Sequence, residues 1–213
     1  MIVNERVVDY INSLDCGNSD ICNTIEKEAR LDNVPIIRKE MGNLLKVLLA
    51  LKQPSRILEV GTAVGYSSIL MSENMPEGCN ITTIENYEVR IPIAKENFKR
   101  AGKADVITLI EGDATQVLTT LDGEYDFIFM DAAKGQYINF LADILRLMPK
   151  GGLLISDNVL QEGDIVESRY GITRRNRTIH TRMRDYMYML THSEQLITSI
   201  VPIGDGITLS VKK

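Results

Sequence analysis

The feature that most constrains the fold is an alternation that begins at Arg56. From there, short apolar runs alternate with longer amphipathic stretches. The runs are RILEV (56–60), NITTIE (80–85), DVITLI (105–110), YDFIFMD (125–131) and GLLISD (152–157). Their hydrophobicity is continuous rather than alternating, which indicates strands buried on both faces. We therefore predict an α/β domain with a doubly wound, Rossmann-like, mostly parallel sheet and helices on both faces.

The rest of the chain completes this architecture. Helical patterns occupy 66–74, 87–101, 114–121, 135–148 and 174–191. Two last strands are expected at 194–201 and 206–212, joined through Pro202 and Gly204-Asp205-Gly206, and they would bring the sheet to seven strands with an antiparallel edge strand. Helix-period patterns between 1 and 52 predict an N-terminal helical extension to an α/β core over 53–213. The whole chain, 1–213, is predicted to form one domain.

Composition excludes several classes of protein. The three cysteines are odd in number and match no zinc spacing, so we expect reduced thiols in a reducing compartment. The N-terminus lacks a signal-peptide pattern, and no stretch approaches the ~20 apolar residues that cross a bilayer. The expected location is cytoplasmic, without a membrane partner. A net charge of −5 argues against a generally basic nucleic-acid coat.

A glycine loop follows the first predicted strand. Gly61 and Gly65 flank Thr62, Glu59 precedes them, and Ser67 opens the next helical stretch. The spacing is neither the dinucleotide fingerprint nor a P-loop. It is a looser form that accommodates an amino-acid moiety rather than a pyrophosphate. A tight strand–helix turn without any ligand is the alternative.

Two further strand ends sharpen this interpretation. Glu85 ends the second strand, where an acid typically accepts hydrogen bonds from a ribose diol, although alone it would be a solvated strand-end acid. Asp113 and Ala114 follow the third strand, positioned to contact an adenine edge. The three strand ends together describe an adenosine site without a phosphate clamp. They favour S-adenosylmethionine (SAM) over NAD or ATP.

An oxygen-rich set follows the fourth and fifth strands. Asp131 ends one, and Asp157 and Asn158 end the other. Each alone is typical of a helix cap or turn, but together beside an adenosine site they suit Mg²⁺, with Mn²⁺ or Ca²⁺ as alternatives. A divalent cation lowers the pKa of a bound hydroxyl and fixes its position for methyl transfer. Lys134 could accept the proton or stabilise the oxyanion; a solvent-facing lysine at a helix start is the other interpretation.

These motifs resemble metal-dependent class I O-methyltransferases of the caffeoyl-CoA and catechol type over about residues 34–213. The resemblance rests on LEVGTAVGYS (58–67), TIE (83–85), EGDA (111–114), FMDAAKGQY (129–137), GGLLISDNVLQEG (151–163) and PIGDGI (202–207). It implies that Asp131, Asp157 and Asn158 hold the metal. It also implies that Lys134 and Asp131 are catalytic.

The same resemblance implies the cofactor contacts. Glu85 would be the ribose acid, and Asp113 and Ala114 would meet the adenine. Ser67 and the loop from Gly61 to Gly65 would meet the methionine end. The remaining contacts expected of SAM are Glu59, Thr62, Asp131 and Ile37, the last lying where the N-terminal extension covers the cofactor.

One departure from the family pattern narrows the choice of methyl acceptor. Small-molecule members often carry Asp-Ala-Asp-Lys, whereas this chain has Ala133 before Lys134. DAAKGQY with an arginine-rich stretch after SDNVL looks more like the bacterial tRNA 5-hydroxyuridine methyltransferases, which form methoxyuridine at the wobble position. The 5-hydroxyl and 4-carbonyl of that base could chelate one metal, as a catechol's two oxygens do. The resemblance therefore implies a tRNA substrate, with a small catechol or a hydroxycinnamoyl-CoA-like acceptor as the alternative.

The basic segment 169–186 holds six arginines and, before Asp185, no acid. We expect it over the active-site mouth, where Arg174, Arg175 and Arg177 could hold an RNA backbone and Tyr170 could stack on a base. The alternative is a solvated helix face whose arginines pair with acids elsewhere. A non-catalytic SAM-binding module is a further hypothesis. The resemblance also implies a homodimer, for which the N-terminal helices offer apolar surface.

Overall fold

A computed structural model describes residues 2–213 as one α/β unit; residue 1 of the predicted domain lies outside the described part. The helices are α1 (Glu5–Ser13), α2 (Asp20–Leu31), α3 (Lys39–Lys52), α4 (Tyr66–Asn74), α5 (Ile91–Arg100), α6 (Ala114–Thr120), α7 (Tyr137–Leu147) and α8 (Arg177–Thr191), with 3-10 turns η1 (Lys134–Gln136) and η2 (Gln161–Val166). The strands are β1 (Arg56–Val60), β2 (Asn80–Glu85), β3 (Ile107–Glu111), β4 (Phe127–Met130), β5 (Leu153–Ser156), β6 (Leu196–Val201) and β7 (Ile207–Lys212).

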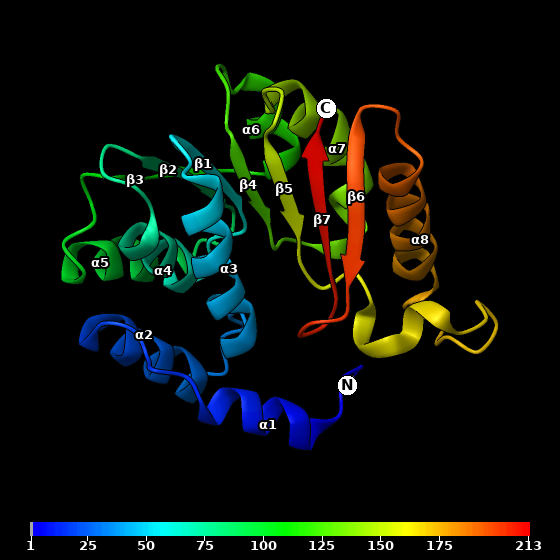
Figure 1. The fold of residues 1–213 in the computed structure, drawn as a ribbon, viewed down its shortest axis with the longest axis horizontal. Coiled ribbons are helices and arrows are strands. Elements are labelled where there is room, and N and C mark those ends of the chain that lie inside the picture. Colours follow the sequence, from blue (N-terminus) through cyan, green and yellow to red (C-terminus); the bar gives the residue numbers. More distant parts are fainter. Residues whose placement is uncertain (1) are drawn as a thin grey trace.

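The strands form one seven-stranded sheet in the order β3-β2-β1-β4-β5-β7-β6. β1 to β5 pair in parallel, and β7 runs antiparallel to both β5 and β6. The doubly wound fold class is therefore confirmed. The predicted hairpin lies at the sheet edge (Figure 1). Its strand β7 lies next to β5, and β6 is the outermost strand.

Helices cover both faces, as the continuous apolar runs predict. Alternate residues of β1 belong to opposite layers: Ile57 is part of the buried cluster that contains residues of α2, α3, α4 and α5, whereas Leu58 is part of the cluster that contains residues of α6, α7 and α8. Both side chains are fully buried. Because the C-terminal ends of β1, β4 and β5 lie at one edge, the side chains that follow them converge there.

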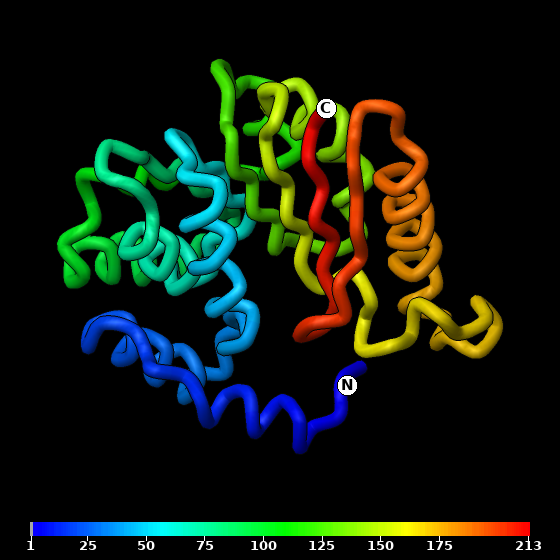
Figure 2. The backbone as a smooth tube through the Cα atoms, in the orientation of Figure 1, coloured from blue at the N-terminus to red at the C-terminus, as the bar shows by residue number. Residues whose placement is uncertain are grey.

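The N-terminal extension is helical, as predicted, and passes beneath that edge (Figure 2). α2 escaped prediction as a separate element; it buries Cys22, Ile25 and Ala29 on one face and packs on α4. α1 buries none of its residues. The linker between α2 and α3 brings Ile37, which is 4% exposed, to the same edge.

Boundaries differ from the prediction at a few elements. β3 begins at Ile107 rather than 105 because residues 103–106 form a turn, in which Lys103 carbonyl accepts from the Val106 and Ile107 amides. α8 begins at Arg177 rather than 174, after a turn over the preceding residues. Among residues 2–213, no helix has the length and apolarity needed to cross a membrane.

Candidate active site

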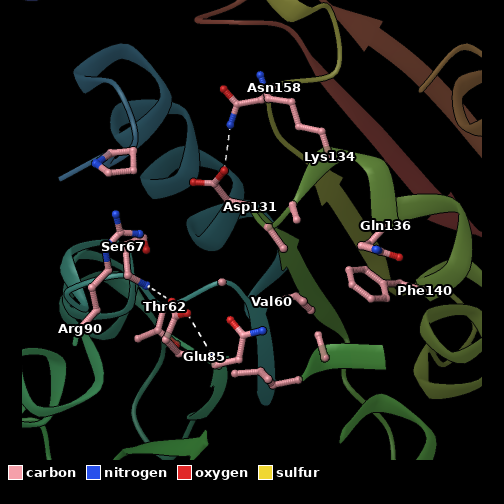
Figure 3. A pocket seen from close by; sticks show the side chains of 18 of the residues that line it. Val60, Thr62, Ser67, Glu85, Arg90, Asp131, Lys134, Gln136, Phe140 and Asn158 are labelled. Atoms are coloured by element: carbon pink, nitrogen blue, oxygen red, sulfur yellow. Dashed lines mark hydrogen bonds between the residues drawn. The ribbon is translucent and has the colours of Figure 1, made fainter. Parts of the chain in front are cut away.

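A cavity of about 450 Å³ opens at the C-terminal ends of β1, β2, β3 and β4 (Figure 3). The predicted site residues that line it are Ile37, Gly61, Thr62, Ser67, Glu85, Asp113, Ala114, Asp131, Lys134 and Asn158. Sequence reasoning missed other lining residues, among them Arg90 at the N-cap of α5 and Phe140 of α7. Both reach the cavity through helix placement, so no local pattern marks them.

The glycines of the loop are required by the protein's own packing. Gly61 has φ 102°, and a Cβ there would overlap the backbone carbonyl of Asp131. Gly65 has φ 85°, and a Cβ there would overlap the Phe98 ring. Gly65 does not line the cavity, so its expected role as a cofactor contact becomes one of shaping the loop. The wall itself is made by Gly61, Thr62 and Ser67.

Glu59 also lies away from the cavity, beneath the loop, contrary to its expected direct cofactor contact. It is fully buried and accepts hydrogen bonds from the hydroxyls of Ser67, Ser68 and Thr83. Thr83 has one hydroxyl proton, so Thr62, 2.6 Å away, donates to it. Burial raises the pKa of Glu59 to about 7, against the opposing effect of these hydroxyls. Glu59 therefore fixes two residues that line the cavity: Ser67 by a direct hydrogen bond and Thr62 through Thr83.

Glu85 is a fixed acceptor rather than a freely solvated acid. Its Oε2 accepts from the Ala63 amide at 2.8 Å, and Oε1 accepts from the Asn86 and Tyr87 amides at 3.0 and 2.9 Å. The backbone therefore holds the carboxylate in place at the end of β2, facing the cavity (Figure 3). A carboxylate fixed in this way can accept hydrogen bonds from a diol without rearrangement.

Asp113 combines capping with lining. Its carboxylate caps α6 by accepting from the Thr115 amide at 2.7 Å, and hydrogen bonding to the Thr115 side chain and then to this amide lowers the pKa of Asp113. The cap fixes the start of α6, and with it Ala114 and Thr115, at the wall of the cavity.

The predicted metal ligands come together as expected of neighbouring strands. Asp131 follows β4 and Asp157 follows β5, and Asn158 Nδ2 donates to Asp131 Oδ1 at 2.8 Å (Figure 3). With Asp205, all three line a second, smaller cavity of about 110 Å³. Burial, then the charge of Asp131, raises the pKa of Asp157 to about 8; burial also raises the pKa of Asp131.

This donor set fits a divalent cation. Two buried carboxylates that repel each other are stabilised when a cation lies between them, and oxygen donors are those that Mg²⁺, Mn²⁺ and Ca²⁺ prefer. Residues 2–213 hold no cluster of three or more His, Cys, Asp or Glu side chains suited to a metal, so the candidate donors are the two carboxylates and the side-chain oxygen of Asn158. Its amide nitrogen faces Asp131, so ligation through its oxygen requires the amide to turn over.

Lys134 lies in η1 at the cavity rim, and its Nζ lies 3.1 Å from Asp205 Oδ2. Its side chain is 34% exposed, so it is not the solvent-facing lysine of the alternative interpretation. Asp205 is 7% exposed and belongs to the turn between β6 and β7. The GDG sequence predicts that turn, but only the fold shows that its aspartate meets Lys134.

The basic segment lies beside the site rather than over its mouth. None of its residues lines either cavity described above. α8 packs against η1 and η2, and Arg182 Nη1 donates to the Gly135 carbonyl at 2.9 Å, next to Lys134. Among residues 2–213, none of the six arginines forms an ion pair, so the alternative of pairing with acids elsewhere is not what the structure has.

The doubly wound sheet, with a cavity and an acidic pair at its strand ends, has the architecture of Rossmann-like α/β enzymes. Residues 20–213 match the family model described as O-methyltransferase, and the chain belongs to this family. It is 32% identical over 191 residues to caffeoyl-CoA O-methyltransferase 5 of Nicotiana tabacum, covering 83% of this chain and 77% of that one. It is 33% identical over 135 residues to a catechol O-methyltransferase of Niastella koreensis, covering 62% and 61%.

Solved structures agree with the sequence relatives. A Staphylococcus aureus protein assigned to the caffeoyl-CoA O-methyltransferases superposes with a TM-score of 0.91 at 31% identity, over 98% of this chain and 100% of that one. An O-methyltransferase of Streptomyces achromogenes involved in tomaymycin synthesis, solved in complex with SAM, superposes with a TM-score of 0.86 at 26% identity, over 98% and 96%.

Proposed function

We propose that this protein is a SAM- and divalent-metal-dependent O-methyltransferase that converts 5-hydroxyuridine at the tRNA wobble position to 5-methoxyuridine. The broader activity, SAM-dependent methyl transfer to an oxygen, follows from membership of the family and leaves no place for a non-catalytic SAM-binding module. SAM supplies a methyl group on a sulfonium. The acceptor and the metal are the proposed parts.

Different residues of the large cavity would bind the different parts of SAM. Glu85 would accept hydrogen bonds from the ribose hydroxyls, Asp113 and Ala114 at the start of α6 would contact the adenine, and Ser67 and Gly61 would contact the methionine end, since all of them line the cavity. Asp131 stands between this cavity and the smaller one, because it lines both. A transferring methyl group and an acceptor oxygen can therefore be brought together beside it.

Asp131, Asp157 and Asn158 would hold the divalent cation. A bound cation lowers the pKa of an acceptor hydroxyl and fixes its position. Lys134, held at the rim by Asp205, places a positive charge where the acceptor oxygen becomes an anion. Ile36 and Ile37 line both cavities and exclude water from that side.

The observation that carries the RNA acceptor is the unpaired basic segment. Arg174 and Arg175 are exposed and form no ion pair with any residue in 2–213, and Tyr170 is 85% exposed. Arginines that no protein acid neutralises can hold a phosphate backbone, and an exposed ring can stack on an unpaired base. Contact with η1 places the segment next to the site.

The test is methylation of hydroxyuridine-containing tRNA by the purified protein, followed by mass spectrometry of its nucleosides. We expect methoxyuridine to form, to be lost in Asp131→Ala, and to be lost when a chelator is added and restored by Mg²⁺. Arg174→Ala with Arg175→Ala should raise KM for the tRNA and leave SAM binding unchanged. Unmodified tRNA with the active protein refutes the RNA acceptor.

The second candidate acceptor is a small catechol or a hydroxycinnamoyl-CoA-like phenol, and it is favoured by the similarity to plant caffeoyl-CoA and bacterial catechol enzymes. It predicts turnover of catechols at low KM that the substitutions at Arg174 and Arg175 do not change. Asp131→Ala abolishes turnover under both candidates, so the two are separated by which acceptor the unmodified protein methylates and by the effect of the arginine variants.

A homodimer is also part of the proposal. α1 exposes Val7, Tyr10 and Ile11, and Leu14 follows at its C-terminal end; each is at least 44% accessible in one chain. An exposed apolar helix face is typical of a protein–protein contact. Light scattering after size exclusion should give twice the 23.9 kDa of the chain, and Tyr10→Asp should shift it towards the monomer. A monomer in the unmodified protein refutes this part.

A further inference from the structure

The turn between β6 and β7 is hydrogen-bonded to the backbone segment that directly follows Asp157 and Asn158. The Val159 amide donates to the Gly206 carbonyl at 2.9 Å, and the Leu160 amide donates to the Asp205 carbonyl at 3.0 Å. A Cβ on Gly206 would overlap the Leu160 side chain, so the two segments are in close contact. The backbone of Asp205 is therefore fixed in position independently of its side-chain contacts.

The two carboxylate oxygens of Asp205 bind different elements. Oδ2 accepts from Lys134 Nζ in η1 at 3.1 Å, and Oδ1 accepts from the Glu162 amide in η2. The side chain is buried and lines the smaller cavity together with the metal-binding residues. One aspartate thus joins the lysine at the rim to the loop that leads to the basic segment.

The loop it holds is conformationally unusual. Gln161, Glu162 and Gly163 all have positive φ, at 51°, 55° and 101°. Two consecutive residues with side chains in the left-handed region are costly and persist only where the surroundings hold them. The hydrogen bond that the Glu162 amide donates to the Asp205 carboxylate is one such contact.

We propose that Asp205 is a positioning residue for methyl transfer: it holds the Lys134 ammonium at the active-site rim and couples its position to η2. Lys134 has a flexible four-carbon side chain that is a third exposed, so without a partner it would sample many rotamers. The inference rests on the proposed function, because it assumes that Lys134 contributes to the reaction.

The test is a double-mutant cycle on hydroxyuridine-containing tRNA with Lys134→Ala, Asp205→Asn and both together. We expect Asp205→Asn to lower kcat by about tenfold or more with KM for SAM within about twofold, since a misplaced charge affects the transition state more than the ground state. The double variant should be no slower than Lys134→Ala. Asp205→Glu should recover part of the rate, because it restores the charge.

A matched control is Asp164→Asn, which removes an exposed carboxylate from the same loop. It should leave kcat unchanged. S-adenosylhomocysteine affinity and the thermal midpoint are measured for every variant, so a variant that has lost the fold is recognised. If Asp205→Asn has lost the fold, Asp205→Glu replaces it in the double-mutant cycle with Lys134→Ala.

The outcomes separate the two proposals. If Lys134→Ala keeps full activity, the proposed role of Lys134 fails. If Lys134→Ala is slow and Asp205→Asn is not, or if the two losses multiply in the double variant, Asp205 does not act through Lys134 and the inference is overturned. Failure of every form of the protein on tRNA refutes the acceptor instead, and the same cycle is then run on a catechol.

Discussion

Replacing Glu59 by Gln tests the buried network beneath the glycine loop. The carboxyl of Glu59 is fully buried, and within the described part of the chain its hydrogen-bond partners are the hydroxyls of Ser67, Ser68 and Thr83. Burial raises its pKa from 4.5 to about 7. Gln resembles the protonated carboxyl, with one accepting oxygen and a donor, so the substitution removes the titration and keeps the shape.

The direction in which the stability contribution of Glu59 changes with pH follows from its folded and unfolded pKa values. Because the folded pKa lies above the unfolded one, the unfolded chain ionises first as the pH rises. The contribution of Glu59 to stability is fully present below pH 4.5 and is lost as the pH rises through about 7. A difference of about 2.5 in pKa corresponds to about 3 kcal/mol at 1.36 kcal/mol per unit, and about 2.5 kcal/mol of it falls between pH 5 and 8.

Urea unfolding at pH 5 and at pH 8, with a chelator present, measures this contribution. We expect Glu59→Gln to be close to the unmodified protein at pH 5 and to gain about 2–3 kcal/mol relative to it by pH 8. Titrating groups that do not interact with Glu59 cancel in the difference; the exception is Asp131, whose charge contributes to the raised pKa of Glu59. Glu124→Gln, at an exposed position, is the control. A difference that stays constant within about 0.5 kcal/mol across this range would refute the argument.

Three further substitutions test packing, each by urea unfolding. Gly61→Ala should cost more than about 2 kcal/mol, because φ is 102° and the new Cβ would overlap the Asp131 carbonyl; an effect below about 1 kcal/mol contradicts this. Tyr186→Phe should cost about 1–3 kcal/mol, because it leaves the buried Ser156 hydroxyl without the Tyr186 partner 2.6 Å away; no loss argues that Ser156 re-pairs. His180→Val should be neutral or stabilising, since neither ring nitrogen of this buried side chain has a partner among residues 2–213; a loss above about 1 kcal/mol would indicate a bound water.

Much of the sheet is local in origin, which is why the sequence predicts it. β1, β2 and α4 begin and end where their apolar patterns do. α2 was missed because its buried face consists of small or isolated residues, such as Cys22 and Ala29, among charged ones. Its helical state depends on the contact with α4, which no short window of sequence reports.

The site shows the same division. Asp131 and Asp157 were predictable because the register of adjacent parallel strands brings their ends together. Glu59 and Asp205 were not predictable in their actual roles, because each depends on which distant side chains meet it. Glu59 stands next to a glycine loop and was expected to touch the ligand, yet Thr83 and the two serines surround it.

The arginines of the basic segment are not equivalent, although the sequence presents them as one cluster. Arg177 Nε donates to the Ile172 carbonyl at 3.1 Å and its Nη2 to the Tyr170 carbonyl at 3.4 Å, so it holds the loop that carries Arg174 and Arg175. Arg177→Ala should therefore weaken RNA binding indirectly and raise the proteolytic sensitivity of this loop. Arg174→Ala should weaken RNA binding with no change in proteolysis, as an exposed phosphate contact would. Equal proteolysis of both variants would mean that the hydrogen bonds of Arg177 do not order the loop.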